Sequence, residues 1–291
     1  MNLGIKNKIY DIFIYAFITM VILICVIPFL HVASLSLSST PAVMSQKVTI
    51  LPVEFNLEAY EKVFSDSSML QSLKVSIEVT TIFSALGLLI TILLAYPLSR
   101  KDLKGKTIFM MLVLFTFYFN AGIIPNFINI FKLGLMDSIW ALILPLALSP
   151  YNMILMKTFF QVSIPESLEE SARLDGCSHL GILTRIVIPL SKPIIATILL
   201  FYAVGRWNAF QDAFFYISSR EIYPLQLKLY FLIAASMTAP SLGEGGDIMQ
   251  QLPPEVVKAA SIMFATLPII IVYPWLQKYF VKGVMIGAVK G

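Results

Sequence analysis

The sequence predicts an all-α integral membrane protein with six transmembrane helices and with both termini on the cytoplasmic side. Three observations support this fold class: the composition, the long runs without formal charge, and the distribution of Lys and Arg among the loops. Of the 291 residues, 58% are hydrophobic and 13% are charged, and the mean hydropathy is +0.82. Soluble domains carry about 25% charged residues, so this composition places the chain in the membrane class.

The uncharged runs give the positions of the spans, because a helix needs about 20 apolar residues to cross a bilayer. The first run follows Asp11, and four later runs lie between consecutive charged residues. A further run begins at Pro193 but contains Arg206 and Asp212. The predicted spans are about 12–34, 74–99, 107–130, 138–158, 193–216 and 259–280, within a single transmembrane domain, 1–291.

The first apolar run could also belong to a cleaved signal peptide, because Lys6 and Lys8 precede it. The run is long, however, and no Ala-x-Ala-like site closes it cleanly. We therefore expect an uncleaved first span.

The orientation follows from the excess of Lys and Arg on the cytoplasmic side of membrane proteins. With the N-terminus inside, the inner segments hold 13 of the 21 Lys and Arg residues. This predicts outer loops at 35–72 and 218–258 and a cytoplasmic loop at 159–192. Within the second outer loop, Leu225–Ser236 is apolar but too short to span comfortably, so we expect an interfacial or re-entrant helix. The glycine-rich segment Gly243–Gly246 predicts a loop.

Other function classes receive little support from the sequence. A net charge of +4 gives no global attraction to nucleic acid. Cys25 and Cys177 form no disulfide framework and no metal-ligand spacing, and we find no catalytic triad or paired-carboxylate site. We therefore expect no enzyme activity, no bound metal and no cofactor in this chain.

The loop 159–192 carries the strongest local signals. Ser163, followed three residues later by Glu166, has the form of a capping box, with Pro165 in the first turn. The pattern predicts a helix that begins there and ends near Leu174. Gly176 then provides the left-handed conformation that ends helices.

A second short helix is predicted after this turn, with Ser178 as its cap and with its end before Pro189. We expect the first helix to expose Glu169, Glu170 and Arg173. From physical chemistry alone, the loop is equally well interpreted as a solvated amphipathic connector or as a contact surface for another protein.

The series Glu170-Ser-Ala172, Gly176 and Ile186-Val-Ile-Pro189 resembles the EAA motif of binding-protein-dependent ABC importers, and both of its spacings match. The resemblance implies the type I ABC importer permease fold and a coupling helix that docks on an ATPase subunit. Ser171 and Cys177 stand where Ala is common, and Ile188 replaces Leu, which leaves the identity of the ATPase partner open. The implied coupling residues are Glu166, Glu169, Glu170, Ser171, Ala172, Asp175, Gly176, Ile186 and Pro189.

Shorter signatures resemble permeases for oligosaccharides and polysaccharide fragments, such as those for lipo-oligosaccharide, alginate and pectin fragments. They are Gly122-Ile-Ile-Pro125, Leu133-Gly-Leu135, Trp207-Asn208, Tyr273-Pro274, Lys282-Gly-Val and Gly287-Ala-Val-Lys-Gly291. The resemblance implies a bacterial cytoplasmic membrane protein that imports a saccharide delivered by an extracellular solute-binding protein. The implied partners are a second, homologous permease subunit in a heterodimer and two ABC ATPase subunits that use ATP and Mg. A permease for a non-sugar solute, such as a peptide or an amino acid, is the alternative.

Polar residues inside spans are candidates for the substrate path, because they are costly in lipid. On a continuous helix over 193–216, Asn208, Gln211 and Asp212 would share a polar side, and Trp207 and Phe210 an aromatic side. The alternative is that the aromatic residues form an interfacial belt and that Arg206 pairs within a subunit interface. Asn120 and Gly122 in the third span mark either a gate or a packing kink. The predicted path residues are Asn120, Gly122, Arg206, Trp207, Asn208, Phe210, Gln211 and Asp212.

Overall fold

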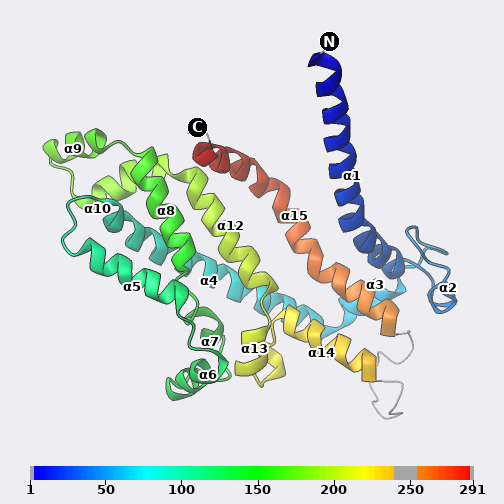
Figure 1. Cartoon of the computed structure of the whole chain (residues 1–291). Coiled ribbons are helices and arrows are strands. Elements are labelled where there is room, and N and C mark those ends of the chain that lie inside the picture. The colour runs from blue at the N-terminus through cyan, green and yellow to red at the C-terminus, as the bar shows by residue number, and fades with distance from the viewer. Residues whose placement is uncertain (1–2, 239–253, 289–291) are drawn as a thin grey trace. The chain divides into compact units, whose positions relative to one another are not determined.

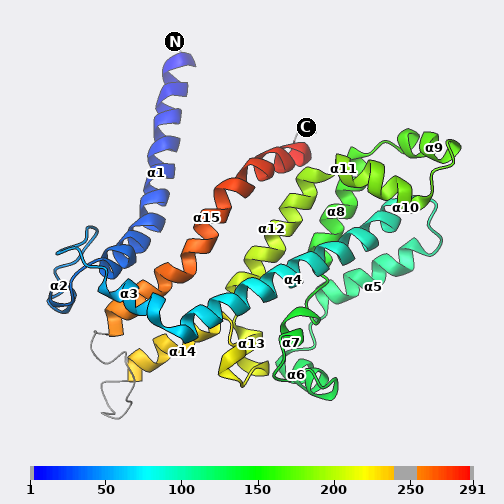
Figure 2. The same cartoon turned by 180° about the vertical axis from the view of Figure 1, so that it is seen from behind.

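The computed structural model describes residues 3–238 and 254–288, and the elements in these ranges are helices, with one isolated antiparallel bridge between Ser38 and Phe55 (Figures 1 and 2). The predicted loop Gly243–Gly246 and the last three residues of the tail signature lie outside the described residues. The helices are α1 (Leu3–Ser36), α2 (Thr40–Met44), α3 (Glu58–Ser65), α4 (Ser67–Ser99), α5 (Lys106–Tyr118), α6 (Ile123–Lys132), α7 (Trp140–Ile143), α8 (Pro150–Ser163), α9 (Glu166–Leu174), α10 (His179–Ile182), η1 (Leu183–Val187, a π-helical turn), α11 (Ile188–Leu190), α12 (Lys192–Asn208), α13 (Gln211–Tyr216), η2 (Arg220–Ile222, 3₁₀), α14 (Leu225–Thr238) and α15 (Pro254–Ala288).

The chain forms two compact units. The first comprises residues 1–70 and 229–267, and the second comprises residues 71–228 and 268–291. In the first unit, the rings of Phe64 on α3 and Phe264 on α15 meet edge to face, with centroids 5.2 Å apart. Apolar side chains lie around the whole circumference of α1, and no other part of the described chain covers most of them. This is typical of a helix that faces lipid.

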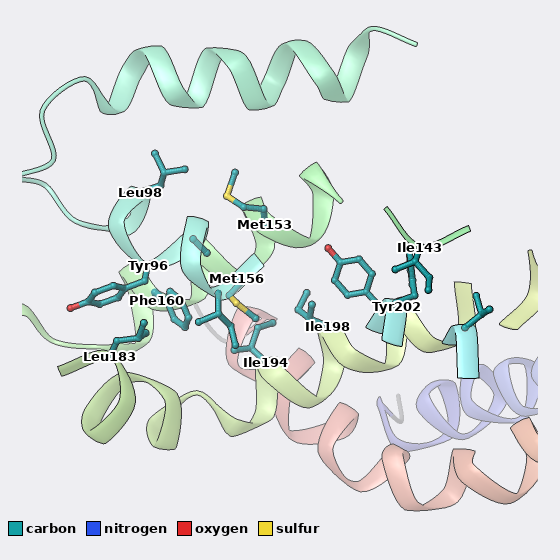
Figure 3. Packing of buried hydrophobic residues seen from close by; sticks show 14 of the residues in the cluster. Tyr96, Leu98, Ile143, Met153, Met156, Phe160, Leu183, Ile194, Ile198 and Tyr202 are labelled. Carbon is teal, nitrogen blue, oxygen red and sulfur yellow. The ribbon is translucent and has the colours of Figure 1, made fainter. Parts of the chain in front are cut away.

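The core of the second unit is formed by α4, α8 and α12. Met153, Met156 and Phe160 of α8 are fully buried, and Figure 3 shows them among side chains of the neighbouring helices. On α12, Ile194 and Ile198 are buried four residues apart. This spacing places them on one face of the helix, so α12 presents a continuous stripe to the core.

Within residues 71–228 the functional candidates lie at two opposite ends. Figures 1 and 2 place α9 and α10 at one end of the bundle formed by α4, α5, α8 and α12, and α6, α7 and α13 at the other. We call these the α9 end and the α13 end. The core therefore separates two regions that do not touch.

Three described helical stretches are long and apolar enough to cross a membrane: Tyr10–Ser36, Ser67–Ser99 and Glu255–Val272. Two bent pairs of helices would raise the number to five if each pair were one span: α5 with α6, bent by 114°, and His179–Leu190 with α12, bent by 83°. The chain is thus a multi-pass membrane protein, while the number of six spans stays a prediction. The expected short helix after residue 224 is present as α14.

Three of the predicted spans are not continuous helices. The stretch 107–130 breaks between α5 and α6 at Gly122, whose φ of +86° leaves the helical region. The stretch 138–158 breaks between α7 and α8, where Pro145 and Pro150 cannot donate backbone hydrogen bonds. The stretch 193–216 breaks at Ala209, whose ψ of 133° is extended. In membranes, irregular backbone is tolerated where protein buries it or where it lines a cavity.

Candidate functional site

The start of α9 differs from the predicted capping box. Ser163 is the last residue of α8, and α9 begins after Pro165, which makes no side-chain cap. Ile164 is extended, with φ −115° and ψ 108°, as expected for a residue before proline, and its side chain is buried. The Glu166 carboxylate instead receives a hydrogen bond from Lys101 Nζ at 2.9 Å. The capping-box prediction was therefore wrong, because Ser163 is still part of α8 and the residue that precedes α9 is a proline, whose side chain cannot accept a hydrogen bond.

The end of α9 agrees with the sequence. Gly176 has a φ of +79°, and no atom lies within 4 Å of the position that a Cβ would take. The Cys177 N–H then donates to the Ala172 carbonyl at 2.9 Å, which satisfies one of the free carbonyls of the last turn. The left-handed conformation of Gly176 is confirmed.

The second helix begins as predicted but runs further. Ser178 Oγ accepts a hydrogen bond from the Gly181 N–H at 3.2 Å and caps α10. The helix then continues through the π turn of η1 and through Pro189 to Leu190, so its predicted end before the proline was wrong. The wider π turn precedes the proline, where an α-helical turn would meet the proline ring.

The orientation of α9 shows that Glu169, which was expected to be exposed, is buried. Glu169 points inward and is 3% exposed, whereas Glu170 and Ser171 are exposed. Leu174, at the C-terminal end, is 90% exposed. The outward face of α9 thus combines a carboxylate, a small residue and an uncovered leucine, while Glu169 faces the turn after α4.

At the α13 end, Arg206 and Asp212 form a bidentate ion pair. Arg206 Nη1 and Nη2 donate to the carboxylate at 2.5 and 2.8 Å, and Nη1 also donates to the Leu142 carbonyl at 3.0 Å. The Arg206 side chain is 2% exposed, and its guanidinium lies over the Phe83 ring, 5.7 Å from the centroid. The pair folds α13 back toward α12, which explains why the stretch 193–216 is broken.

The break separates the predicted path residues into two groups. Arg206 and Trp207 are buried, whereas Asn208, Phe210 and Gln211 are exposed. The Asn208 side chain donates to the carbonyl of Val204 at 2.9 Å. The expected polar and aromatic sides of one helix are therefore not present as predicted.

A cavity of about 660 Å³ opens beside this break. Its walls come from α4, from the segment before and at the start of α8, and from α12. The lining is mostly apolar and aromatic, with Ser149, Asn152 and Arg206 as its polar residues. The lining residues are Phe83, Leu146, Leu148, Ser149, Pro150, Tyr151, Asn152, Phe201, Tyr202, Val204, Gly205, Arg206 and Ala209.

Tyr202 holds the irregular wall of this cavity. Its hydroxyl accepts a hydrogen bond from the Ser149 N–H at 3.0 Å and shares a second one with Thr91 Oγ1 at 2.8 Å. Gly87 on α4 approaches so closely that a Cβ there would lie 2.9 Å from both the Ala147 carbonyl oxygen and the Tyr202 ring. Sequence reasoning missed this cluster, because nothing in the chain marks residues 87, 91, 149 and 202 as neighbours.

The predicted third-span residues lie at the other break. The Gly122 N–H donates to Asn120 Oδ1 at 2.9 Å, and both residues lie at the 114° bend between α5 and α6. α6 then packs on α13, with the rings of Phe127 and Tyr216 6.4 Å apart. Asn120 and Gly122 therefore stabilise a sharp change of direction, while a gating role stays a prediction.

Asp137 is a second residue that sequence reasoning missed. Its N–H donates to the Tyr216 carbonyl at 2.8 Å, and its carboxylate accepts from the Ser218 N–H, the Ser219 N–H and the Ser219 hydroxyl. The hydrogen bonds from Ser219, followed by that from Ser218, lower the pKa of the Asp137 carboxyl below its ordinary value. Its φ is +58°, a conformation that Asp adopts more readily than most residues, but the sequence pattern did not point to this residue.

Among the described residues, no group of three or more His, Cys, Asp or Glu side chains lies close enough to hold a metal ion.

Comparison with known proteins adds a third line of evidence. The profile of the family described as "Binding-protein-dependent transport system inner membrane component" matches residues 78–286. The chain is 45% identical to the polygalacturonan/rhamnogalacturonan transport system permease protein YtcP of Bacillus subtilis (strain 168), over 98% of this chain and 100% of that protein. It is 31% identical to the melibiose/raffinose/stachyose import permease protein MelC of the same organism, over 91% of each chain.

Among solved structures, one crystal structure is that of a bacterial ABC transporter involved in the import of the acidic polysaccharide alginate. One of its chains is 33% identical to this protein and superimposes with a TM-score of 0.85, over 96% of this chain and 99% of that chain.

Proposed function

We propose a saccharide-import role for this chain, which belongs to the family of inner membrane components of binding-protein-dependent transport systems. As a permease subunit it moves a solute and is not itself catalytic. The chain would form part of the path for an oligosaccharide or polysaccharide fragment, because two relatives that match it over 100% and 91% of their length are named for such substrates. A solute-binding protein outside the cell would deliver the saccharide to the outer loops.

The remaining parts of the assembly are part of the same proposal. The chain would cross the bacterial cytoplasmic membrane six times with both termini inside, paired with a homologous permease subunit in a heterodimer. Two ABC ATPase subunits would bind ATP and Mg and supply the energy.

The single observation that carries the coupling role is the outward face of α9. Glu170, Ser171 and Leu174 are exposed on a helix whose opposite face is fixed to the chain, so this face is free to meet another protein. A leucine at 90% exposure in a cytoplasmic loop would be covered by such a partner. We therefore propose that α9 is the contact with the ATPase, and that Asp175, Gly176, Ile186 and Pro189 fix its connection to α12.

The proposed substrate path is the cavity at the broken α12–α13 segment. Sugars present both hydroxyl edges and apolar C–H faces, so a path needs hydrogen-bonding groups beside aromatic rings. Tyr151 and Asn152 line the cavity, and Asn208, Phe210 and Gln211 are exposed at the break. In this proposal Arg206 and Asp212 do not bind the saccharide but hold the shape of the wall.

The decisive experiment is uptake by the complete transporter in proteoliposomes, with the cognate binding protein and a labelled oligogalacturonide. We expect ATP-dependent uptake that disappears when the ATPase is omitted. If the binding protein binds a peptide or an amino acid and no saccharide, the alternative substrate class is correct. Uptake without the ATPase would contradict the proposed mechanism.

The coupling role of α9 has its own test. Glu170→Lys reverses a charge at the proposed contact, and Gly176→Val places a β-branched residue at φ +79°, a conformation that costs such residues about 1–3 kcal/mol. We expect both variants to assemble but to lose most ATP-dependent uptake. Gly134→Val is the matched control, because it places the same residue at a similar φ of +67° with no atom within 4 Å of the new Cβ, outside both the proposed ATPase contact and the cavity lining. Normal uptake by both α9 variants would contradict the assignment.

A further inference from the structure

Glu169 faces the body of the protein instead of the partner side of α9. Its carboxylate lies 2.5 Å from Arg100 Nη1, and the two side chains are 3% and 11% exposed. The Tyr96 hydroxyl lies 3.5 Å from the other carboxylate oxygen, and the Arg100 guanidinium lies over the Tyr96 ring at 5.0 Å. Tyr96 and Arg100 are four residues apart at the end of α4, so they present one surface to Glu169.

Two exposed ion pairs flank this buried one. Lys101 Nζ lies 2.9 Å from the Glu166 carboxylate, and Arg173 Nη1 lies 3.4 Å from the Asp102 carboxylate. Three consecutive residues, 100–102, thus contact residues 166, 169 and 173, which lie on one side of α9. The three contacts therefore fix the position of α9 relative to the turn that follows α4.

This contact creates a connection that the chain itself does not provide. α9 is joined covalently to α8 through Ile164 and Pro165, and to α10 through the turn at Gly176. α4 lies more than 60 residues earlier in the sequence, yet its end is attached to α9 by the buried pair. Gln161 on α8 adds a hydrogen bond to the Ser99 carbonyl at 3.2 Å, so the same end of α4 is also tied to α8.

Of the three ion pairs, the buried one should contribute most to holding α9 against the end of α4 when α9 is displaced. Exposed ion pairs are screened by water and contribute little, whereas a buried charge without its partner is strongly unfavourable. Among the described residues, Nε and Nη2 of Arg100 have no hydrogen-bond partner, and Oε1 of Glu169 meets Nη1 as an ion-pair contact without hydrogen-bond geometry. Loss of Glu169 would therefore leave the buried guanidinium without its counter-charge.

We propose that Glu169 and Arg100 are positioning residues that transmit the displacement of α9 to α4. The inference rests on the proposed function, since it requires an ATPase that moves α9. α4 then carries the motion along its length to Thr91, whose hydroxyl is bound to Tyr202 in the wall of the cavity. Glu169 is thus assigned to the transmission of movement within the permease and not to contact with the ATPase.

The test uses the complete transporter in proteoliposomes, with saccharide uptake and ATP hydrolysis measured on the same preparation. We expect Glu169→Gln and Arg100→Gln to lower the amount of saccharide imported per ATP hydrolysed by about tenfold or more. The KM for ATP and the amount of assembled ATPase should stay at wild-type values. Arg100→Lys, which keeps the charge, should retain most of the coupling, and the exchanged pair Arg100→Glu with Glu169→Arg should recover part of it.

The matched control is the exposed neighbouring pair, because Lys101→Gln should change the coupling ratio by less than about twofold. Wild-type coupling in Glu169→Gln would overturn the proposal. So would loss of bound ATPase in that variant, which would make Glu169 a contact residue, or an exchanged pair no better than the single variants at equal assembly. If the wild-type complex hydrolyses ATP but imports no saccharide, the proposed function fails instead, and the variants can still be compared through ligand-stimulated ATP hydrolysis.

Discussion

At the α9 end, charged side chains join segments that are distant in sequence, and two of the three ion pairs are exposed to water. At the α13 end, Arg206 and Asp212 are six residues apart, yet the Arg206 side chain is 2% exposed and also holds the Leu142 carbonyl. The first arrangement leaves one face of α9 free for a partner. The second closes the wall of a cavity.

Charged side chains therefore have different roles at the two ends of this membrane protein. A surface exposed to water can carry several ion pairs at low cost, and each contributes about 0–1 kcal/mol. In a buried region a single pair must satisfy every donor and acceptor, because an unpaired charge there is costly. The buried Arg206–Asp212 pair should therefore contribute much more to stability than the two exposed ion pairs at the α9 end.

The largest effect should come from Arg206→Ala. The change removes the Arg206 donors from the Asp212 carboxylate, which keeps the Ala213 N–H at 3.0 Å, and from the Leu142 carbonyl. Removal of one partner of a buried pair costs about 3–5 kcal/mol. Thermal unfolding of the purified chain in detergent should show a large loss of stability. The control Lys101→Ala breaks an exposed pair and should cost at most about 1 kcal/mol. If the two variants lose equal stability, the distinction between the two ends is wrong.

A smaller effect should follow from Gly87→Ala. The new Cβ would lie 2.9 Å from the backbone oxygen of Ala147 and 2.9 Å from the Tyr202 ring, and hydrogen bonds to Thr91 and Ser149 hold this ring in place. Overpacking of this kind costs about 1–3 kcal/mol. The same unfolding measurement should place this variant between wild type and Arg206→Ala.

Gly205→Ala supplies the matched comparison on α12, because a Cβ there meets no atom within 4 Å. Alanine is favoured over glycine inside a helix by about 0.5–1 kcal/mol, so this variant should be as stable as wild type or slightly more stable. A Gly87→Ala variant as stable as Gly205→Ala would show that the wall of the cavity can move.

The sequence predicted the α9 end better than the α13 end, and the reason is physical. Gly176 and Ser178 act on neighbouring backbone groups, so local chemistry determines their roles. The inward direction of Glu169 depends instead on Arg100, about 70 residues away. The break after α12 could not be predicted because hydropathy treats Arg206 and Asp212 as two unfavourable charges and contains no information about their pairing. The family resemblance did not supply that information either, because its signature in this span, Trp207-Asn208, includes neither Arg206 nor Asp212.

The smallest effect concerns Asp137, which joins the segment before α7 to the segment after α13. Hydrogen bonds from Ser219 and Ser218 hold the pKa of this carboxyl below its ordinary value of 3.8. Because the pKa is lowered in the folded state, the contribution to stability is present above the unfolded pKa and is lost as the pH falls through the folded value. Wild type should therefore be more stable than Asp137→Asn near neutral pH, and the difference should shrink as the pH falls below about 4.

Asparagine keeps the size of the side chain and tolerates the φ of +58° found at this position, so the substitution isolates the charge. Ser219→Ala removes the hydroxyl whose hydrogen bond lowers the pKa most, and it should weaken the same pH dependence without abolishing it. The measurement is the unfolding midpoint of wild type and of both variants between pH 3 and pH 7. A difference between wild type and Asp137→Asn that does not change over this range would mean that the carboxylate charge does not hold these two segments together. The serine hydrogen bonds would then stabilise an amide equally well.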